Sequence, residues 1–289
     1  MDGIIILDKE KDMFSRTAGY RVAKIFNTKK FGHIGTLDPM ATGVLPIIIG
    51  NTTKMIPFIE EFCPNKKEYL FGIKFGIETD SLDISGKIVK KAGKIPNEED
   101  IISACNKLVK TTEQIPPVFS AVHINGKRAY ELGRRGENIE LPARKINLYE
   151  LKYIGNSRDE FNFKIVCSRG TYVRAIVRDI AKFCDTIGTT TYIRRTKTNG
   201  FDIKNAVKLD FLENLVNNGK AVEEYLMASD FALGDIPVIN LDTEDVKLYK
   251  NGGFIKTGEV GGLRRVYSGK EFIGIGCVKN GLLCPKRTM

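Results

Sequence analysis

Histidine is scarce in this chain of 289 residues, in which His33 and His123 are the only two. Neither stands near a serine or cysteine in the sharp turn that presents a hydrolase nucleophile, so a Ser-His-Asp hydrolase is not expected. The six cysteines form no Cys-x-x-Cys pair, and no histidine follows one at metal-ligand spacing, which argues against a zinc site. A Gly-Lys-Ser or Gly-Lys-Thr phosphate loop is also missing, so nucleotide hydrolysis is not expected.

Long hydrophobic runs and a signal-peptide start are missing as well. The apolar runs at residues 4–7 and 44–49 are too short to cross a membrane. The chain starts with an acidic residue, Asp2, where a signal peptide has basic ones. A chain of this length can also bury a full core without disulfides. These absences predict a cytoplasmic protein without a membrane partner, and with no sign of an oligomer interface the default expectation is a monomer.

Acidic residues are outnumbered by basic ones, 35 against 45, which leaves a net charge of +10. This balance favours a polyanionic partner, with nucleic acid first and an anionic membrane surface second. The basic residues occur as scattered pairs, which indicates a basic face on a folded surface and not a disordered tail. The pairs that are candidates for nucleic acid contacts are Lys29 with Lys30, Lys66 with Lys67, and Arg134 with Arg135.

Strand and helix patterns are mixed along the chain. Residues 67–77 alternate, with Tyr69 and Phe71 facing the apolar side, which predicts a strand with one buried face. Asn97 followed by three acidic residues predicts the start of a helix, and a strand over 161–167 is followed by a helix after Gly170. Because strands and helices do not alternate regularly, we expect an α+β fold around a large, mostly antiparallel sheet.

A small β-rich module is predicted near the C-terminus, where short apolar segments are separated by glycine-rich turns. We place the domains at residues 1–228 and 229–289, within a boundary region of about 215 to 235. Gly274-Ile275-Gly276 would fit a dinucleotide-binding turn only if a helix followed, and the next residues predict a turn instead.

A charged residue stands in the glycine-rich stretch of residues 32–45, which reads Gly-His-Ile-Gly-Thr-Leu-Asp-Pro-Met-Ala-Thr-Gly-Val-Leu. Asp38 comes directly before Pro39, and Asp-Pro initiates turns well, so the residues alone favour a turn role over catalysis. The whole string, however, resembles the signature loop of the TruB family of tRNA pseudouridine synthases. In that family the Asp of this motif is the catalytic carboxylate.

Further segments resemble the same family, in family order, along about residues 3–203. They are Lys67-Glu68-Tyr69 with the Thr/Asp-rich stretch that ends at Gly86, Gln114-Ile115-Pro116-Pro117-Val118-Phe119-Ser120-Ala121, Cys167-Ser168-Arg169-Gly170-Thr171-Tyr172-Val173-Arg174, and Arg194-Arg195-Thr196 with Gly200. The chain departs from the pattern at Glu10, Asp12, Phe14 and His123, where the family usually has Pro, Gly, Thr and Lys. These departures leave the catalytic positions intact and bear on loop packing and one basic contact.

The resemblance implies the pseudouridine synthase fold with a PUA-like RNA-binding module at the C-terminus. It implies an isomerase that cuts uracil from ribose at N1 and rejoins it through C5, with no cofactor and no metal. The implied substrate is the uridine numbered 55 in the T-arm loop of tRNA, without an obligatory protein partner. Two alternatives stay open: an RNA-binding or tRNA-folding chaperone on the same scaffold, and a guide-dependent relative that acts on other RNAs.

The resemblance also assigns residues. Asp38 is the carboxylate, which could attack the base, attack the sugar or remove a proton. A carboxylate shielded from water tends to become protonated, so it needs a cation beside it, and Arg174 is the candidate, with an exposed helix arginine as the alternative. Tyr69 would stack on the flipped-out uracil, with core packing as the alternative. His33 could serve as a base at neutral pH, but is assigned with Thr36 and the basic pairs to RNA binding; loop packing is the alternative for Thr36.

Overall fold

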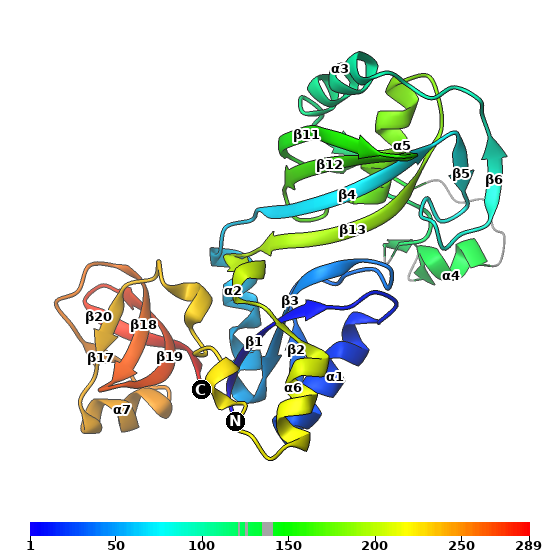
Figure 1. Ribbon diagram of the computed structural model, residues 1–289. Helices are drawn as coiled ribbons and strands as arrows, with labels where there is room; N and C mark the ends of the chain where they lie inside the picture. Colours follow the sequence, from blue (N-terminus) through cyan, green and yellow to red (C-terminus); the bar gives the residue numbers. More distant parts are fainter. Residues whose placement is uncertain (121, 125–126, 135–140) are drawn as a thin grey trace. The chain divides into compact units, whose positions relative to one another are not determined.

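The computed structural model describes residues 1–120, 122–124, 127–134 and 141–289, and the chain forms two compact units (Figure 1). The first unit holds Met1–Asp38, Val44–Pro64 and Asn199–Met289. The second holds Pro39–Gly43 and Asn65–Thr198. The chain therefore passes from one unit to the other directly after Asp38.

The second unit is built on a four-stranded antiparallel sheet with strand order β11-β12-β4-β13. Its elements are β4 (Lys67–Phe75), β5 (Ile77–Thr79), β6 (Ile88–Lys91), α3 (Glu98–Leu108), β7 (Glu113–Gln114), β8 (His123–Ile124), β9 (Lys127–Arg128), α4 (Ala129–Arg134), β10 (Arg144–Lys145), β11 (Leu148–Ser157), β12 (Glu160–Cys167), α5 (Val173–Phe183) and β13 (Gly188–Thr198). Helices α3 and α5 pack against each other and against this sheet (Figure 1).

Two local predictions for this unit concern β4 and α3. The buried face of β4 is confirmed, since Tyr69, Phe71, Ile73 and Phe75 are all buried. The predicted single strand over residues 67–77 is wrong at its end, because Gly76 has a φ of +84° and breaks the strand before β5. The predicted start of α3 is confirmed, because the side chain of Asn97 accepts a hydrogen bond from the backbone N of Asp100 at 2.8 Å.

The first unit contains the N-terminal strands and helices. Its elements before the C-terminal module are β1 (Gly3–Lys9), α1 (Ser15–Ile25), β2 (Phe31–His33), most of β3 (Thr42–Ile49), the 3₁₀ helix η1 (Gly50–Met55), α2 (Ile56–Phe62), β14 (Phe201–Asp202), η2 (Ile203–Asn205), β15 (Val207–Lys208), α6 (Leu209–Asn217), η3 (Glu223–Tyr225) and η4 (Phe231–Leu233). Strand β1 lies between β3 and a parallel β15, and α1 and α6 pack on β1 and on each other (Figure 1). The 3₁₀ helix η1 leads directly into α2, and Pro57 lies in the first turn of α2, where proline is favoured.

The C-terminal module is a five-stranded sheet with strand order β16-β18-β19-β20-β17. It comprises β16 (Val238–Asn240), α7 (Thr243–Lys250), β17 (Ile255–Lys256), β18 (Gly262–Ser268), β19 (Glu271–Lys279) and β20 (Leu282–Thr288). The turn predicted after the Gly274-Ile275-Gly276 stretch is confirmed, since Asn280 and Gly281 have φ values of 51° and 71° between β19 and β20. The α+β fold with mostly antiparallel sheets and a β-rich C-terminal module is thus confirmed. In the described part of the chain, no helix combines the length and apolar character that crossing a membrane requires.

Candidate active site

Asp38 lies at the end of a loop that leaves β2 and leads into β3. Strand β2 pairs antiparallel with β3, with His33 opposite Ile47. Gly35 has a φ of 69°, a left-handed conformation that glycine adopts without steric cost. Leu37, the residue before Asp38, is buried, while Asp38 itself is partly exposed.

Ser15, the first residue of α1, holds the end of this loop in place. Its hydroxyl donates to the backbone O of Leu37 at 3.0 Å and accepts from the backbone N of the same residue at 2.9 Å. Both residues are buried, so these bonds are shielded from water. Sequence reasoning missed Ser15, because its partner stands 22 residues away and no local pattern joins the two.

The departures at residues 10–14 fall in the turn that leads to α1. Lys9 is almost fully buried, and its Nζ donates to the backbone O of Glu10 and of Met13, each at 2.7 Å. Asp12 has a φ of 61°, a conformation that aspartate tolerates better than most residues other than glycine. Phe14 is the N-cap of α1 and has no oxygen with which to cap the helix, which costs about 1 kcal/mol relative to threonine. The turn thus leads into a helix that has no side-chain cap at its start.

His33 and Thr36 lie close together in the same loop. The Nε2 atom of His33 and the Oγ1 atom of Thr36 are 3.1 Å apart, within hydrogen-bond distance. Thr36 is exposed, and His33 is partly exposed. The two side chains predicted to bind RNA therefore contact each other at the surface of the first unit.

The residues that follow Asp38 are fixed to the sheet of the second unit. Thr42 and Gly43 pair in parallel with Arg194 and Arg195 of β13. Gly43 has a φ of 101°, and a Cβ atom there would lie 2.2 Å from the backbone O of Arg195. Glycine is therefore required at this position, both for the conformation and for the close approach of the two backbones.

Tyr69 lies opposite Arg195 in the antiparallel pair of β4 and β13. Both side chains are buried, with exposed fractions of 7% for Tyr69 and 0% for Arg195, and they share a hydrogen bond. Burial lowers the pKa of the Arg195 guanidinium, and the interaction with Tyr69 opposes this shift. The sequence singled out Arg195 as part of a motif but did not predict that it would bind Tyr69.

Arg174 is the second residue of α5 and is buried, so the alternative of an ordinary exposed helix arginine is wrong. Its Nη1 donates to the backbone O of Ser81 at 2.8 Å, and its Nη2 donates to the backbone O of Phe119 at 2.9 Å. The Oδ2 atom of Asp83 lies 3.7 Å from Nη1. The helix dipole disfavours a cation at a helix N-terminus. The oxygen atoms around the guanidinium therefore explain how Arg174 is stabilised at this position.

Three of the segments that carry the family motifs therefore meet at Arg174. Arg174 belongs to the segment at the start of α5. A second segment contributes Ser81 and Asp83, and a third contributes Phe119. Asp83 is itself buried, and its Oδ1 accepts from the Oγ of Ser81 at 3.0 Å and from the backbone N of Ser85 at 3.0 Å. The sequence did not predict a role for Asp83.

The basic residues expected to contact RNA differ in their exposure. Lys29, Lys30 and Lys66 are exposed, and Lys67 is partly buried. The Nζ of Lys30 donates to Asn51 at 3.2 Å, and the Nζ of Lys66 lies 4.8 Å above the ring of Tyr149. The side chain of Arg134 and the whole of Arg135 lie outside the described residues.

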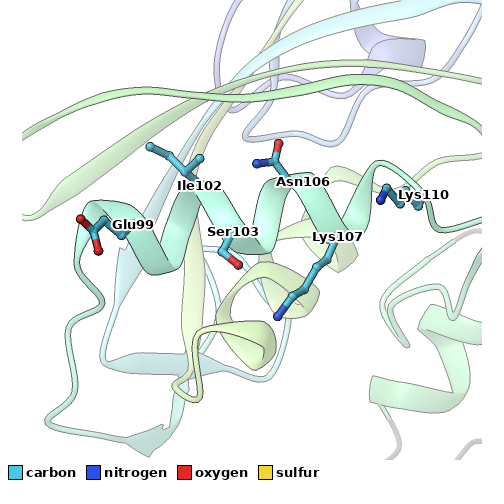
Figure 2. A pocket seen from close by; sticks show the side chains of 6 residues that line it. All are labelled: Glu99, Ile102, Ser103, Asn106, Lys107 and Lys110. Atoms are coloured by element: carbon cyan, nitrogen blue, oxygen red, sulfur yellow. The ribbon is translucent and has the colours of Figure 1, made fainter.

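A shallow pocket of about 400 Å³ lies on the outer face of α3 (Figure 2). Its lining residues are Glu99, Ile102, Ser103, Asn106, Lys107 and Lys110. These come from one helix and the turn after it, outside the motif segments, so the pocket contains none of the candidate catalytic residues. Within the described ranges, no three His, Cys, Asp or Glu side chains are grouped so that they could hold a metal ion.

Comparisons with known proteins give one consistent family. Residues 23–173 match the model of the TruB family pseudouridylate synthase (N terminal domain), and residues 237–289 match that of pseudouridine synthase II TruB, C-terminal. The tRNA pseudouridine synthase B of Caulobacter vibrioides is 40% identical over 246 residues, which cover 85% of this chain and 78% of the relative. The protein of the same name from Francisella philomiragia is 36% identical over 290 residues, 99% of this chain and 94% of the relative.

A solved structure shares the fold. The structure of an H/ACA RNP bound to a substrate RNA containing 2'-deoxyuridine includes a chain that aligns with a TM-score of 0.69 at 18% sequence identity. The alignment covers 99% of the present chain and 84% of that chain. At this identity the likeness supports the fold alone.

Proposed function

The chain belongs to the TruB family of pseudouridylate synthases, and we propose that it converts uridine 55 in the T-arm loop of tRNA into pseudouridine, with Asp38 as the catalytic carboxylate. The protein is a tRNA pseudouridine synthase, and so an isomerase. The bond between N1 and C1' of the uridine breaks, a bond between C5 and C1' forms, the C5 proton leaves and N1 becomes protonated. No atom is gained or lost in the product.

Asp38 is proposed to supply an ionised carboxylate at the glycosidic bond. The loop geometry supports this role, because the buried hydroxyl of Ser15 binds both backbone polar groups of Leu37, the residue before Asp38. A carboxylate that must react in one position gains from a backbone that is held in place next to it.

Arg174 is proposed to keep Asp38 ionised when the site is closed to water. A neighbouring cation lowers the pKa of a carboxylate and offsets the effect of burial. The carbonyl groups of Ser81 and Phe119 fix the plane of the guanidinium, and a guanidinium has five N–H donors, enough to serve a second carboxylate as well. A planar donor group of this kind pairs with a carboxylate through two parallel hydrogen bonds.

Tyr69 is proposed to stack on the uracil after the base has left the RNA stack. Flipping a base costs a few kcal/mol, and stacking on an aromatic ring offsets about 1–3 kcal/mol per base. The hydrogen bond to buried Arg195 supports this role, because it fixes the ring from its hydroxyl end. The ring orientation is then set before the substrate arrives.

The remaining RNA contacts are proposed at the surface. His33 and Thr36 would touch bases of the T-arm loop, and the exposed lysines would bind phosphates, which predicts salt-dependent affinity. Residues 229–289 are proposed as a separate RNA-binding domain of the PUA-like kind. We further propose that the protein acts as a monomer in the cytoplasm, without an obligatory protein partner.

Incubation of the purified chain with an unmodified tRNA transcript tests this function. We expect pseudouridine at position 55 and at no other uridine, and no product from a matched transcript with cytidine at that position. Binding without product would instead support the chaperone alternative. Product that required added guide RNA and partner proteins would support the guide-dependent alternative.

A further inference from the structure

The side chain of Gln114 binds both backbone polar groups of one residue in the neighbouring segment. Its Oε1 accepts a hydrogen bond from the backbone N of Tyr172 at 2.8 Å, and its Nε2 donates to the backbone O of Tyr172 at 3.2 Å. Gln114 is 4% exposed, so the amide group is shielded from water. Two hydrogen bonds to the backbone of one residue fix both its position and its orientation.

Tyr172 is the N-cap of α5, and Arg174 stands two residues further on. The first N–H groups of a helix have no partner within the helix and are usually served by a short side chain at the N-cap. Tyrosine cannot do this, because its hydroxyl lies at the far end of the ring. Gln114, which is distant in sequence, instead binds the backbone of the N-cap residue itself, and so determines where the helix begins.

The segment that carries Gln114 touches the first turns of α5 at two further points. Phe119 accepts from Arg174 at 2.9 Å, and Ile115 accepts from the Nη2 of Arg178 at 3.0 Å. The segment and the helix start are therefore fixed to one another. Movement of Tyr172 would move Arg174 with it, since both belong to the same helical turn.

We propose that Gln114 is a positioning residue for Arg174, and that its amide sets the position of the guanidinium during pseudouridine formation. This inference rests on the proposed function, because it matters for turnover only if Arg174 takes part in it. A displacement of about 1 Å in a reacting constellation can lower the rate about 100-fold. Loss of the amide should therefore reduce the rate of the chemical step more than it reduces tRNA binding.

Two substitutions test the inference, with the single-turnover rate and the Kd for tRNA measured for each. Gln114→Met keeps the length of the side chain but removes both hydrogen bonds, and we expect a rate at least about tenfold lower with an unchanged Kd. Gln114→Glu can accept from Tyr172 but cannot donate to it while ionised. When protonated it can do both, and burial raises the pKa of such a carboxyl.

The pH profile of Gln114→Glu therefore separates positioning from general stability. We expect the ratio of its rate to the wild-type rate to rise as the pH is lowered, because the protonated carboxyl reproduces the amide. A defect of packing alone would give a ratio that does not change with pH. This profile also tests the inference if Gln114→Met fails to fold.

Two control variants complete the test. Thr186 lies just beyond the C-terminal end of α5, and its hydroxyl donates to the backbone O of Lys94 at 2.7 Å. Thr186→Val removes this hydrogen bond and should keep the wild-type rate. Arg174→Lys should lose most of the activity. If Arg174→Lys is inactive, a wild-type rate for Gln114→Met would overturn only this inference. So would a rate for Gln114→Glu that stays well below the wild-type rate by the same factor at every pH. A wild-type rate for Arg174→Lys would overturn the role of Arg174 in the proposed function.

Discussion

Arg174 and Asp83 form a buried ion pair, with the Nη1 and Oδ2 atoms 3.7 Å apart and side-chain exposures of 5% and 7%. The pair joins the start of α5 to the loop after β5. Asp83 is held in turn by the hydroxyl of Ser81, the backbone N of Ser85 and the hydroxyl of Ser85. A buried ion pair loses its hydration, and hydrogen bonds to the remaining lone pairs of the carboxylate offset part of that cost.

Substitution Asp83→Asn should lower both stability and turnover. The amide keeps an oxygen for the serine donors but removes the negative charge that compensates Arg174. Loss of one member of a buried ion pair lowers the free energy of unfolding by about 3–5 kcal/mol, and by less where other acceptors remain. Arg174 keeps two carbonyl acceptors, so we expect about 1–3 kcal/mol and a rate at least about tenfold lower. Denaturant unfolding and the release of tritium from C5 of labelled uridine measure the two effects.

The matched control for this pair is Ser85→Ala. It removes the hydroxyl that donates to the same carboxylate and leaves the charge of Asp83 in place. We expect a small loss of stability and nearly normal turnover. If Ser85→Ala and Asp83→Asn reduced the rate equally, the charge of Asp83 would not be the cause.

Substitution Tyr69→Phe should reduce turnover at least about tenfold, because it removes the hydroxyl that fixes the ring to Arg195. The control is Tyr192→Phe, which removes a hydroxyl that binds Asn162 at 2.8 Å on a strand of the same sheet. Tyr192→Phe should keep the wild-type rate. Equal rates for Tyr69→Phe and the wild type would show that turnover does not need the hydroxyl or its bond to Arg195.

Substitution Ser15→Ala should destabilise the loop before Asp38. The backbone N and O of Leu37 would lose their buried partner, at a cost of about 1–3 kcal/mol. We expect slower single turnover with unchanged affinity for tRNA. The control is Thr53 of the same unit, whose hydroxyl donates a hydrogen bond to the backbone O of Gly50 at 2.8 Å. Thr53→Val removes this bond and should keep the wild-type rate. A normal rate for Ser15→Ala would show that Leu37 does not need this contact.

The six cysteines should divide into two classes in alkylation experiments. Cys277 and Cys284 are partly exposed and face each other in β19 and β20, so they should react first. The other four are buried, and burial raises the pKa of Cys63, Cys167 and Cys184 to about 11 and that of Cys105 to about 12.

Because the thiolate is the reactive form, the four buried thiols should react slowly at pH 8 and faster as the pH is raised. Mass spectrometry of the native protein after short exposure to iodoacetamide measures this. Rapid labelling of Cys105 or Cys167 at pH 8 would contradict their burial in the fold.

Local patterns in the sequence predicted local structure well. The alternation along β4 identified its buried face, and Asn97 identified the start of α3, because both signals depend on neighbours in the chain. The end of β4 was missed because it depends on the φ angle of one glycine, Gly76. A period-two pattern does not report such a change.

The contacts that support the site could not be predicted in the same way. Ser15 binds Leu37 across 22 residues, Gln114 binds Tyr172 across 58, and Arg174 binds Ser81 across 93. Each depends on the tertiary fold and leaves no periodic signal. The resemblance to a known family pointed to Asp38, Tyr69 and Arg174 as candidates. It did not predict the contacts of Asp83 with Arg174, of Arg195 with Tyr69, or of Gln114 with Tyr172.

The most direct test of the whole account is the rate of pseudouridine formation by Asp38→Asn, measured together with its Kd for tRNA and its Tm. The amide has the same shape but is far less nucleophilic and basic than the carboxylate, so we expect no product, with Kd and Tm close to wild type. Residual turnover together with a lowered Tm would contradict the account, because it would make Asp38 a structural turn residue.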